Sequence, residues 1–267
     1  MRSMYCGRII LVAFLLWSAF IVSDAASAAG QDDVRIKRQE AEQGNANAQL
    51  DLGVMYADGD GVKQDYAQAA SWFQKAAAQG NAGAQYNLGV LYAKGRGVKQ
   101  DDAQAASWYQ QAAARGDVSA MFNLGVMYAK GRGFKQDYTE AAVWYQMAAA
   151  RGHADAQTNL GVLYNSGQGV KQDFAQAASW YQKAAAQGNG AAQTNLGLMY
   201  FSGRGVKQDD AQAVSWFQKA AAQGYAEAQY HLGLFCAASA DYDQARMWFQ
   251  KAAAQGHVQA QKMLNKL

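Results

Sequence analysis

A block that begins Ala-x-Ala-Gln and carries a Leu-Gly pair near its middle returns every 36 residues along most of this chain. The pairs are Leu52-Gly53, Leu88-Gly89, Leu124-Gly125, Leu160-Gly161, Leu196-Gly197 and Leu232-Gly233. A fixed period of this size indicates one small structural unit stacked on copies of itself, with each copy contacting only its neighbours. The sequence therefore predicts a solenoid, a class of protein that mostly binds other molecules.

Each copy contains the signals for two helices. In residues 46–81, Leu52 and Tyr56 lie four residues apart on one stripe of a first helix, helix A, which a pair of glycines then ends. Asp65 is the expected N-cap of a second helix, helix B, and Gly80 its C-terminal stop. Six such repeats are predicted, over residues 46–81, 82–117, 118–153, 154–189, 190–225 and 226–257.

The two ends of the array depart from the repeat. Residues 29–45 match a helix B without its partner, which predicts an N-terminal capping helix, and residues 258–267 match a lone helix A, which predicts a C-terminal capping helix. The sixth repeat also lacks four loop residues between Ala238 and Asp241, so we expect a shorter turn there.

Glycine inside every helix A needs a physical reason, because it costs roughly 1 kcal/mol relative to alanine. We expect a missing side chain to let a large ring of helix B lie against the helix A backbone. The rings expected there are Trp72, Trp108, Trp144, Trp180, Trp216 and Trp248.

The first 28 residues have the pattern of a cleavable signal peptide. Arg2 and Arg8 precede an apolar run, and Ala28 belongs to a group of small residues suited to cleavage. The run, Ile9 to Val22, is 14 residues long, shorter than the roughly 20 of a membrane-spanning helix. We therefore expect export, to the periplasm in preference to the medium, with no stable membrane insertion after cleavage.

Charge and cysteine usage exclude several function classes. Without residues 1–28, the 24 basic and 21 acidic residues become 22 and 20, and a net charge of +2 gives no basic stripe for nucleic acid. The only cysteine left is Cys236, so no intramolecular disulfide is expected. The histidines His153, His231 and His257 are far apart and have no ligand cluster around them, so we predict no metal site, no cofactor and no catalytic residue.

Three segments of the second repeat resemble the Sel1-like repeat. They are the strings from Ala84 to Tyr92 and from Gly95 to Asp101, followed by Ala106-Ser107-Trp108-Tyr109 with Ala112-Ala113. The resemblance covers about residues 45–267 and implies an all-α fold, a right-handed α-solenoid superhelix similar to tetratricopeptide repeats. Such proteins resemble adaptors of protein assemblies, and exported bacterial members look like scaffolds, regulators and host-interaction factors.

One cysteine-rich branch of that family is described as having weak β-lactamase or penicillin-binding activity. This chain lacks the paired cysteines of that branch, and it has no Ser-x-x-Lys, since Ser71 and Lys75 are four residues apart. The resemblance therefore gives little support to an inherited hydrolase activity.

Two columns of helix A positions lie away from the predicted core stripe. Related two-helix solenoids line their concave side with the first helix, so these columns are expected to form a partner-binding groove. An asparagine can both donate to and accept from the backbone of an extended peptide, although bonding between adjacent repeats is the alternative role. The groove residues are Tyr86, Asn87, Phe122, Asn123, Thr158, Asn159, Thr194, Asn195, Tyr230 and His231.

A second candidate surface is a basic edge made by the loops between the two helices. It is either a solvated edge or a site for an acidic partner or an anionic surface. Its residues are Arg96, Lys99, Arg132, Lys135, Arg204 and Lys207.

The sequence thus predicts an exported, non-enzymatic scaffold that binds a protein or peptide along the helix A face. Two alternatives remain: a cell-wall-associated binder or weak β-lactamase-like hydrolase, and a secreted host-directed effector.

Overall fold

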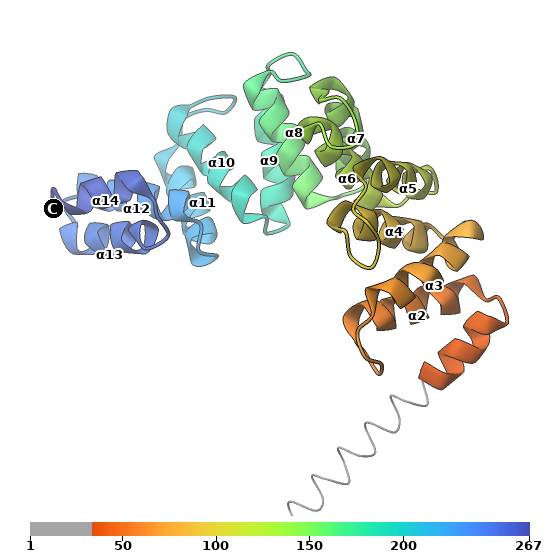
Figure 1. Cartoon of the computed structure of the whole chain (residues 1–267). Helices are drawn as coiled ribbons and strands as arrows, with labels where there is room; N and C mark the ends of the chain where they lie inside the picture. Colours follow the sequence, from red (N-terminus) through yellow and green to blue (C-terminus); the bar gives the residue numbers. More distant parts are fainter. Residues whose placement is uncertain (1–33) are drawn as a thin grey trace, which may run out of the picture. The chain divides into compact units, whose positions relative to one another are not determined.

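A computed structural model describes residues 34–267, which form helices and no strands (Figure 1). The all-α prediction is confirmed for this part of the chain. The predicted signal peptide, residues 1–28, and the first part of the predicted capping segment, residues 29–33, lie outside the described residues. The chain divides into two compact units, with the boundary between Asp117 and Val118.

The helices alternate as helix A and helix B in both units. The first unit contains a helix over residues 34–42, then α2 (Ala46–Asp58), α3 (Tyr66–Ala78), α4 (Ala82–Lys94) and α5 (Asp102–Ala114). The second unit contains α6 (Val118–Lys130), α7 (Tyr138–Ala150), α8 (Ala154–Ser166), α9 (Phe174–Ala186), α10 (Gly190–Ser202), α11 (Asp210–Ala222), α12 (Ala226–Ala238), α13 (Tyr242–Ala253) and α14 (Val258–Leu264).

The helix ends are where the local signals place them. Asp65 caps α3, since its Oδ1 accepts hydrogen bonds from the backbone N–H groups of Ala67 and Gln68, at 2.9 and 3.0 Å. These bonds satisfy N–H groups that have no partner inside the helix. Gly59 follows α2 in the left-handed conformation, with φ of 78°, which glycine adopts without the steric cost of a side chain.

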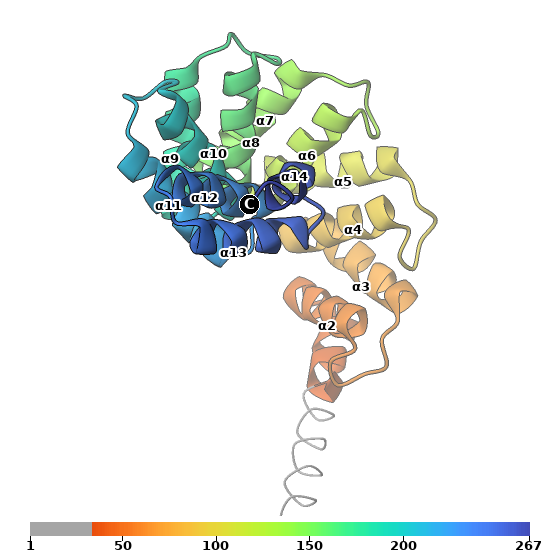
Figure 2. The ribbon, with the colours of Figure 1, turned by 90° about the vertical axis from the view of Figure 1, so that its left-hand side faces the viewer.

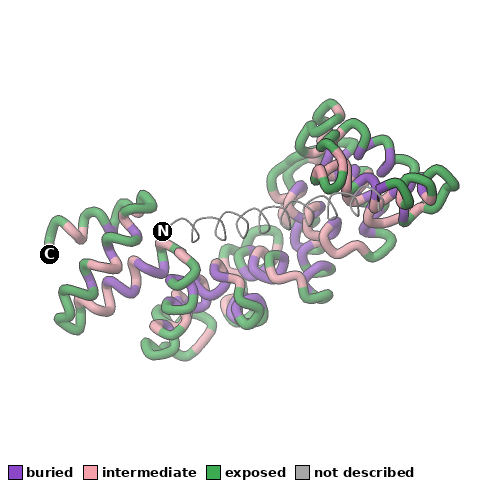
Figure 3. Tube along the Cα trace, turned by 90° about the horizontal axis from the view of Figure 1, so that it is seen from below, coloured by how far each residue is buried: buried purple, intermediate pink, exposed green. Residues whose placement is uncertain are grey.

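Within each repeat, helix A packs against helix B, and in the second unit each helix B also packs against the helix A that follows it. Figure 3 shows buried positions alternating with exposed ones along these helices, as expected for helices that are buried on one stripe. In the second unit, Figure 2 shows α8 and α10 on the inner side of the curve and α9 and α11 on the outer side.

The rings that lie against the helix A glycines are not the tryptophans, so that prediction was wrong. A Cβ added to Gly161 would lie 2.6 Å from Cε1 of Tyr181, the residue after Trp180. Every repeat uses the residue after the tryptophan in this way: Phe73, Tyr109, Tyr145, Tyr181, Phe217 and Phe249. Five of the six tryptophans are only half-buried, and Trp72 alone is buried.

Four of the six tryptophans carry a lysine three residues further along the same helix. The Lys183 Nζ atom lies 4.0 Å from the centre of the Trp180 ring, within cation–π range. The same pairing joins Trp72 to Lys75, Trp216 to Lys219 and Trp248 to Lys251. The tryptophan therefore lies at the outer edge of the core. The aromatic residue that follows it in the sequence fills the core.

A buried glutamine joins successive repeats. The Gln193 Nε2 atom donates to the carbonyl oxygen of Ala185, in the preceding helix B, at 3.2 Å. Its Oε1 atom accepts from the Nε2 atom of Gln223, at 2.9 Å. Gln49, Gln157 and Gln229 make the same pair of bonds. The third repeat has Met121 at this position, and the side chain of Arg151 contacts its sulfur at 3.6 Å.

We predict that Gly161→Ala destabilises the protein. Alanine normally stabilises a helix by roughly 1 kcal/mol relative to glycine. Here the added methyl group meets the Tyr181 ring, and overpacking of this kind costs about 1–3 kcal/mol. Urea unfolding followed by circular dichroism measures the change.

Gly83→Ala is the matched control, because Gly83 is also inside a helix A. A Cβ there would lie 3.1 Å from the Cδ2 atom of Leu50, the end of a flexible side chain that can move. We expect this variant to be neutral or slightly more stable. A Gly161→Ala protein as stable as the Gly83→Ala protein would contradict the packing role of the glycine.

Candidate functional site

The aromatic residues of the first predicted groove column, Tyr86, Phe122 and Tyr230, pack against the aromatic rings of the core. Tyr86 lies 5.9 Å from the ring of Tyr109, and Phe122 lies 6.0 Å from Tyr145, centre to centre. Phe122 also stacks on His153 at 4.6 Å. Tyr230 makes the equivalent contacts, with Phe249 at 5.9 Å and with His257 at 4.6 Å. These aromatic residues are half-buried.

Thr158 and Thr194 belong to the same column but are buried, with 6% of each residue exposed. The Thr158 hydroxyl donates to the carbonyl oxygen of Ala154, and the Thr194 hydroxyl donates to that of Gly190, both at 2.9 Å. Both donors are therefore used inside their own helices, so these two residues have little to offer a partner.

The second predicted column, the asparagines, is half-buried along its length. The Asn159 side chain forms a hydrogen bond with the Tyr145 hydroxyl of the preceding repeat. Burial raises the pKa of Tyr145 to about 12, and this hydrogen bond opposes the rise. Bonding between repeats, the alternative role, is thus present at Asn159, whereas Asn87 and Asn195 line open pockets.

The loop arginines lie across aromatic rings of the preceding repeat. The Arg96 guanidinium lies 5.3 Å from the Tyr66 ring centre, and that of Arg204 lies 5.9 Å from the Phe174 ring centre. The predicted lysines of this edge, Lys99, Lys135 and Lys207, are exposed, as is Arg132.

The same pocket recurs at two junctions between repeats, and we call it the seam pocket. In the first unit its walls include Phe73, Asn87 and Arg96, and its volume is about 200 Å³. In the second unit the equivalent residues are Tyr181, Asn195 and Arg204, around about 310 Å³. Each seam pocket therefore combines an aromatic ring, an amide and a guanidinium group, and it joins the two surfaces that the sequence suggested separately.

The seam pocket of the second unit has additional walls that the sequence reasoning missed. Asn165 and Phe201 stand where four of the repeats have alanine, and both line this pocket. Phe201 is 40% exposed, which is unusual for a large ring. The departure from the repeated alanine was visible in the sequence and could have identified both residues.

His231 closes one side of that pocket and is held by neighbouring groups. Its ring stacks on Phe217 at 5.0 Å, and its Nε2 atom lies 3.3 Å from Glu227 Oε1. The other Glu227 oxygen, Oε2, lies 2.9 Å from the Nε2 atom of His257. Glu227 therefore brings His231 and His257 together, so the expectation that these two histidines are far apart was wrong. Burial lowers the pKa of His231, although Glu227 opposes this shift.

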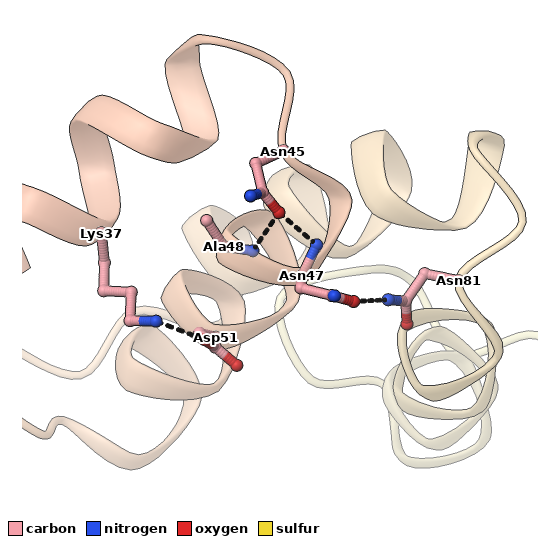
Figure 4. A network of polar contacts seen from close by, with 6 residues as sticks. All are labelled: Lys37, Asn45, Asn47, Ala48, Asp51 and Asn81. Atoms are coloured by element: carbon pink, nitrogen blue, oxygen red, sulfur yellow. Dashed lines mark hydrogen bonds and ion pairs between the residues drawn. The ribbon is translucent and has the colours of Figure 1, made fainter.

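Polar contacts on the helix A side also hold the N-terminal repeats together (Figure 4). Asn45 caps α2, and Asn81, the N-cap of α4, donates from its Nδ2 atom to Asn47 Oδ1 in α2 at 3.0 Å. Lys37 Nζ lies 2.8 Å from Asp51 Oδ2, at the first position of the asparagine column. The N-terminal cap therefore contacts that end of the column.

Within residues 34–267, no three side chains of histidine, cysteine, aspartate or glutamate gather as metal ligands. His153 and His257 act as N-caps, since their Nδ1 atoms accept from the N–H groups of Ala156 and Ala260 at 3.3 and 3.2 Å. None of the helices in this part of the chain combines the length and apolar character needed to cross a membrane.

The paired helices, the capped turns and the glutamine bonds define a repeat solenoid built from two-helix units. The family model for the Sel1 repeat matches residues 46–81, 82–117, 118–153, 154–189, 190–225 and 226–257. The chain belongs to the Sel1 repeat family. Proteins of this family generally act as scaffolds for protein–protein interactions and are generally not enzymes.

Two solved structures show the likeness in three dimensions. A protective antigen present in uropathogenic Escherichia coli strains, displaying an SLR fold, is 40% identical, with a TM-score of 0.81 over 85% of this chain. The match covers 50% of that antigen, so the chain spans half its length. A Sel1 repeat protein from Oxalobacter formigenes is 30% identical, with a TM-score of 0.71 over 85% of this chain and 96% of its own. The comparison with curated proteins gives no match.

We predict that acid destabilises this protein partly through His231. Because the folded pKa lies below the unfolded value of about 6.5, the unfolded state takes up the proton first as pH falls. The stability present above about pH 6.5 is therefore lost as pH falls towards the folded pKa, by at most about 1.4 kcal/mol per pH unit for one group.

His231→Asn restores the residue that four other repeats have at this position. The urea midpoints of both proteins at pH 7.5 and pH 5.5 are the measurement, and the natural protein should lose more stability on acidification. Equal losses in the two proteins would show that His231 does not titrate in this range.

Proposed function

We propose that this chain is an exported, non-enzymatic scaffold that binds an extended segment of a partner protein along its helix A face. The single observation that carries the proposal is the recurrence of the seam pocket, with an aromatic ring, an asparagine amide and an arginine guanidinium group at equivalent positions of both units. The two pockets lie at the same position of the repeat unit, three repeats apart, and each can take one side chain and the neighbouring backbone of an extended segment.

The chemistry of the seam pocket indicates what such a segment needs. An asparagine side chain offers one acceptor and two donors, which suits the backbone of an extended peptide. Arg204 adds a fixed positive charge beside the apolar wall of Phe201. We therefore propose that the partner segment places an apolar side chain against Phe201 and an acidic group near Arg204.

Cross-linking tests which face binds. A photo-reactive phenylalanine analogue at Phe201 should capture a partner in cells, while the same analogue at Val143 should not. Val143 is the matched control, because it is 49% exposed and lies on a helix B. Capture from Val143 and not from Phe201 would assign binding to the other face.

The captured partner is then titrated against Asn195→Ala combined with Arg204→Ala. Loss of both polar contacts should weaken binding by about tenfold to a hundredfold, which corresponds to roughly 1.4–2.7 kcal/mol. Lys171→Ala with Lys135→Ala removes two exposed loop charges that do not line this pocket and should leave the affinity within about twofold. An unchanged affinity of the Asn195→Ala, Arg204→Ala protein would overturn the pocket assignment.

The export part of the proposal rests on the N-terminal sequence. Expression of the full chain in a Gram-negative host should give a processed protein that starts at Ala29 or Gly30 in the periplasmic fraction, and N-terminal sequencing with cell fractionation measures this. Arg2→Glu with Arg8→Glu should reduce processing, because the positive start is lost. A cytoplasmic protein that keeps Met1 would contradict export, and recovery from the medium would favour a secreted protein.

A further inference from the structure

Three apolar side chains normally close the space between helix A, its loop and helix B. They are a tyrosine near the end of helix A, an apolar residue in the loop and the tryptophan of helix B. In the second repeat these are Tyr92, Val98 and Trp108, which pack against one core cluster. The third repeat has a phenylalanine in the loop, and Phe134 stacks on Tyr128 at 4.1 Å. Equivalent sets are Tyr56, Val62 and Trp72, and Tyr200, Val206 and Trp216.

The sixth repeat lacks two of these three side chains. Cys236 stands at the tyrosine position, so the ring is missing. The loop goes from Ala240 directly to Asp241, without the Gly-Val-Lys-Gln that precedes Asp209 in the fifth repeat, so the valine is missing as well. Of the three apolar side chains, the sixth repeat keeps only the tryptophan. Trp248 packs, together with Phe235, against the core cluster that contains Phe217 and Leu232.

A pocket occupies the place of the missing side chains, and we call it the end pocket. Its volume is about 470 Å³, within the range of roughly 300–1,000 Å³ that ligand sites cover. The apolar walls come from α11, α12 and α13 and are Val214, Leu232, Phe235, Cys236 and Trp248. Ala240 holds the tight turn at its edge with φ of 59°, a conformation that costs a residue other than glycine roughly 1–2 kcal/mol.

The end pocket carries a single charge, that of Asp241. This carboxylate caps α13, since its Oδ1 accepts from the Gln244 N–H at 3.1 Å, and its other lone pairs remain available. Burial raises the pKa of the Cys236 thiol and Asp241 raises it further, so the thiol stays neutral near pH 7 and belongs to the apolar wall. The absent loop would have placed a lysine directly after its valine, as Lys207 follows Val206.

We propose that the end pocket binds a protein partner through one aromatic side chain followed by a basic residue. The aromatic ring would take the place of the missing tyrosine and valine, and the basic group would lie beside Asp241. This proposal does not depend on the helix A groove, because the two pockets have no lining residue in common. Failure of either one leaves the other intact.

Protection of Cys236 tests the proposal with a defined probe. The purified protein is treated with iodoacetamide, and the modified fraction of the Cys236 peptide is followed by mass spectrometry with and without acetyl-Tyr-Lys-amide. At a probe concentration about ten times the dissociation constant, alkylation should slow by roughly tenfold, because an occupied pocket shields the thiol. Acetyl-Ala-Lys-amide and acetyl-Tyr-Glu-amide are matched controls that remove the ring and reverse the charge.

A variant with the missing loop restored gives a second, independent test of the end pocket. Insertion of Gly-Val-Lys-Gln between Ala240 and Asp241 returns the valine of the other repeats while Cys236 stays in place. We expect its thiol to react more slowly without any probe, and we expect acetyl-Tyr-Lys-amide to give no further protection. Absence of protection in the natural protein, or equal protection by acetyl-Tyr-Glu-amide, would overturn the proposal whether or not the variant folds.

Discussion

The close contact between a helix A glycine and one ring of helix B sets the geometry of every repeat. A Cβ at Gly161 would lie 2.6 Å from the Tyr181 ring, so only glycine lets the two helices approach this far. Successive residues of a helix point about 100° apart. Because Tyr181 faces the core, Trp180 must lie at its margin, where Lys183 covers it. One missing side chain thus decides which aromatic residue fills the core.

The buried glutamine extends this order from one repeat to the next. The last carbonyl groups of a helix have no partner inside it, and burying them without one is costly. The carbonyl group of Ala185 is one of these, and it accepts from the N–H of Gly188 in the turn after α9 and also from the Gln193 side chain. Gln193 in turn accepts from Gln223. Equivalent bonds in both units hold helix A in the same register against the preceding helix B. This repeated register explains why the seam pocket returns with equivalent walls.

Much of the fold could be predicted because its signals are local. An Asp N-cap and a glycine stop act within a few residues, so Asp65 and Gly59 gave the helix ends directly. The choice of core ring depends instead on the rotation of helix B about its axis, which tertiary packing sets, and the prediction for Trp180 therefore failed. Packing likewise buried Thr158, whereas Phe201 could have been singled out in the sequence by its departure from alanine.

Two of the departures from the repeat lie on α12. His231 lines the seam pocket and Cys236 lines the end pocket. The two residues are five apart, so their side chains point roughly 140° from each other around the helix. Leu232 and Gly233, between them, keep the stacking pattern and are buried. The sixth helix A therefore keeps the buried residues that hold the array together. It differs from the other copies at His231 and Cys236, on two sides of the helix that face pockets. At such positions a solenoid can acquire a specific partner without losing its fold.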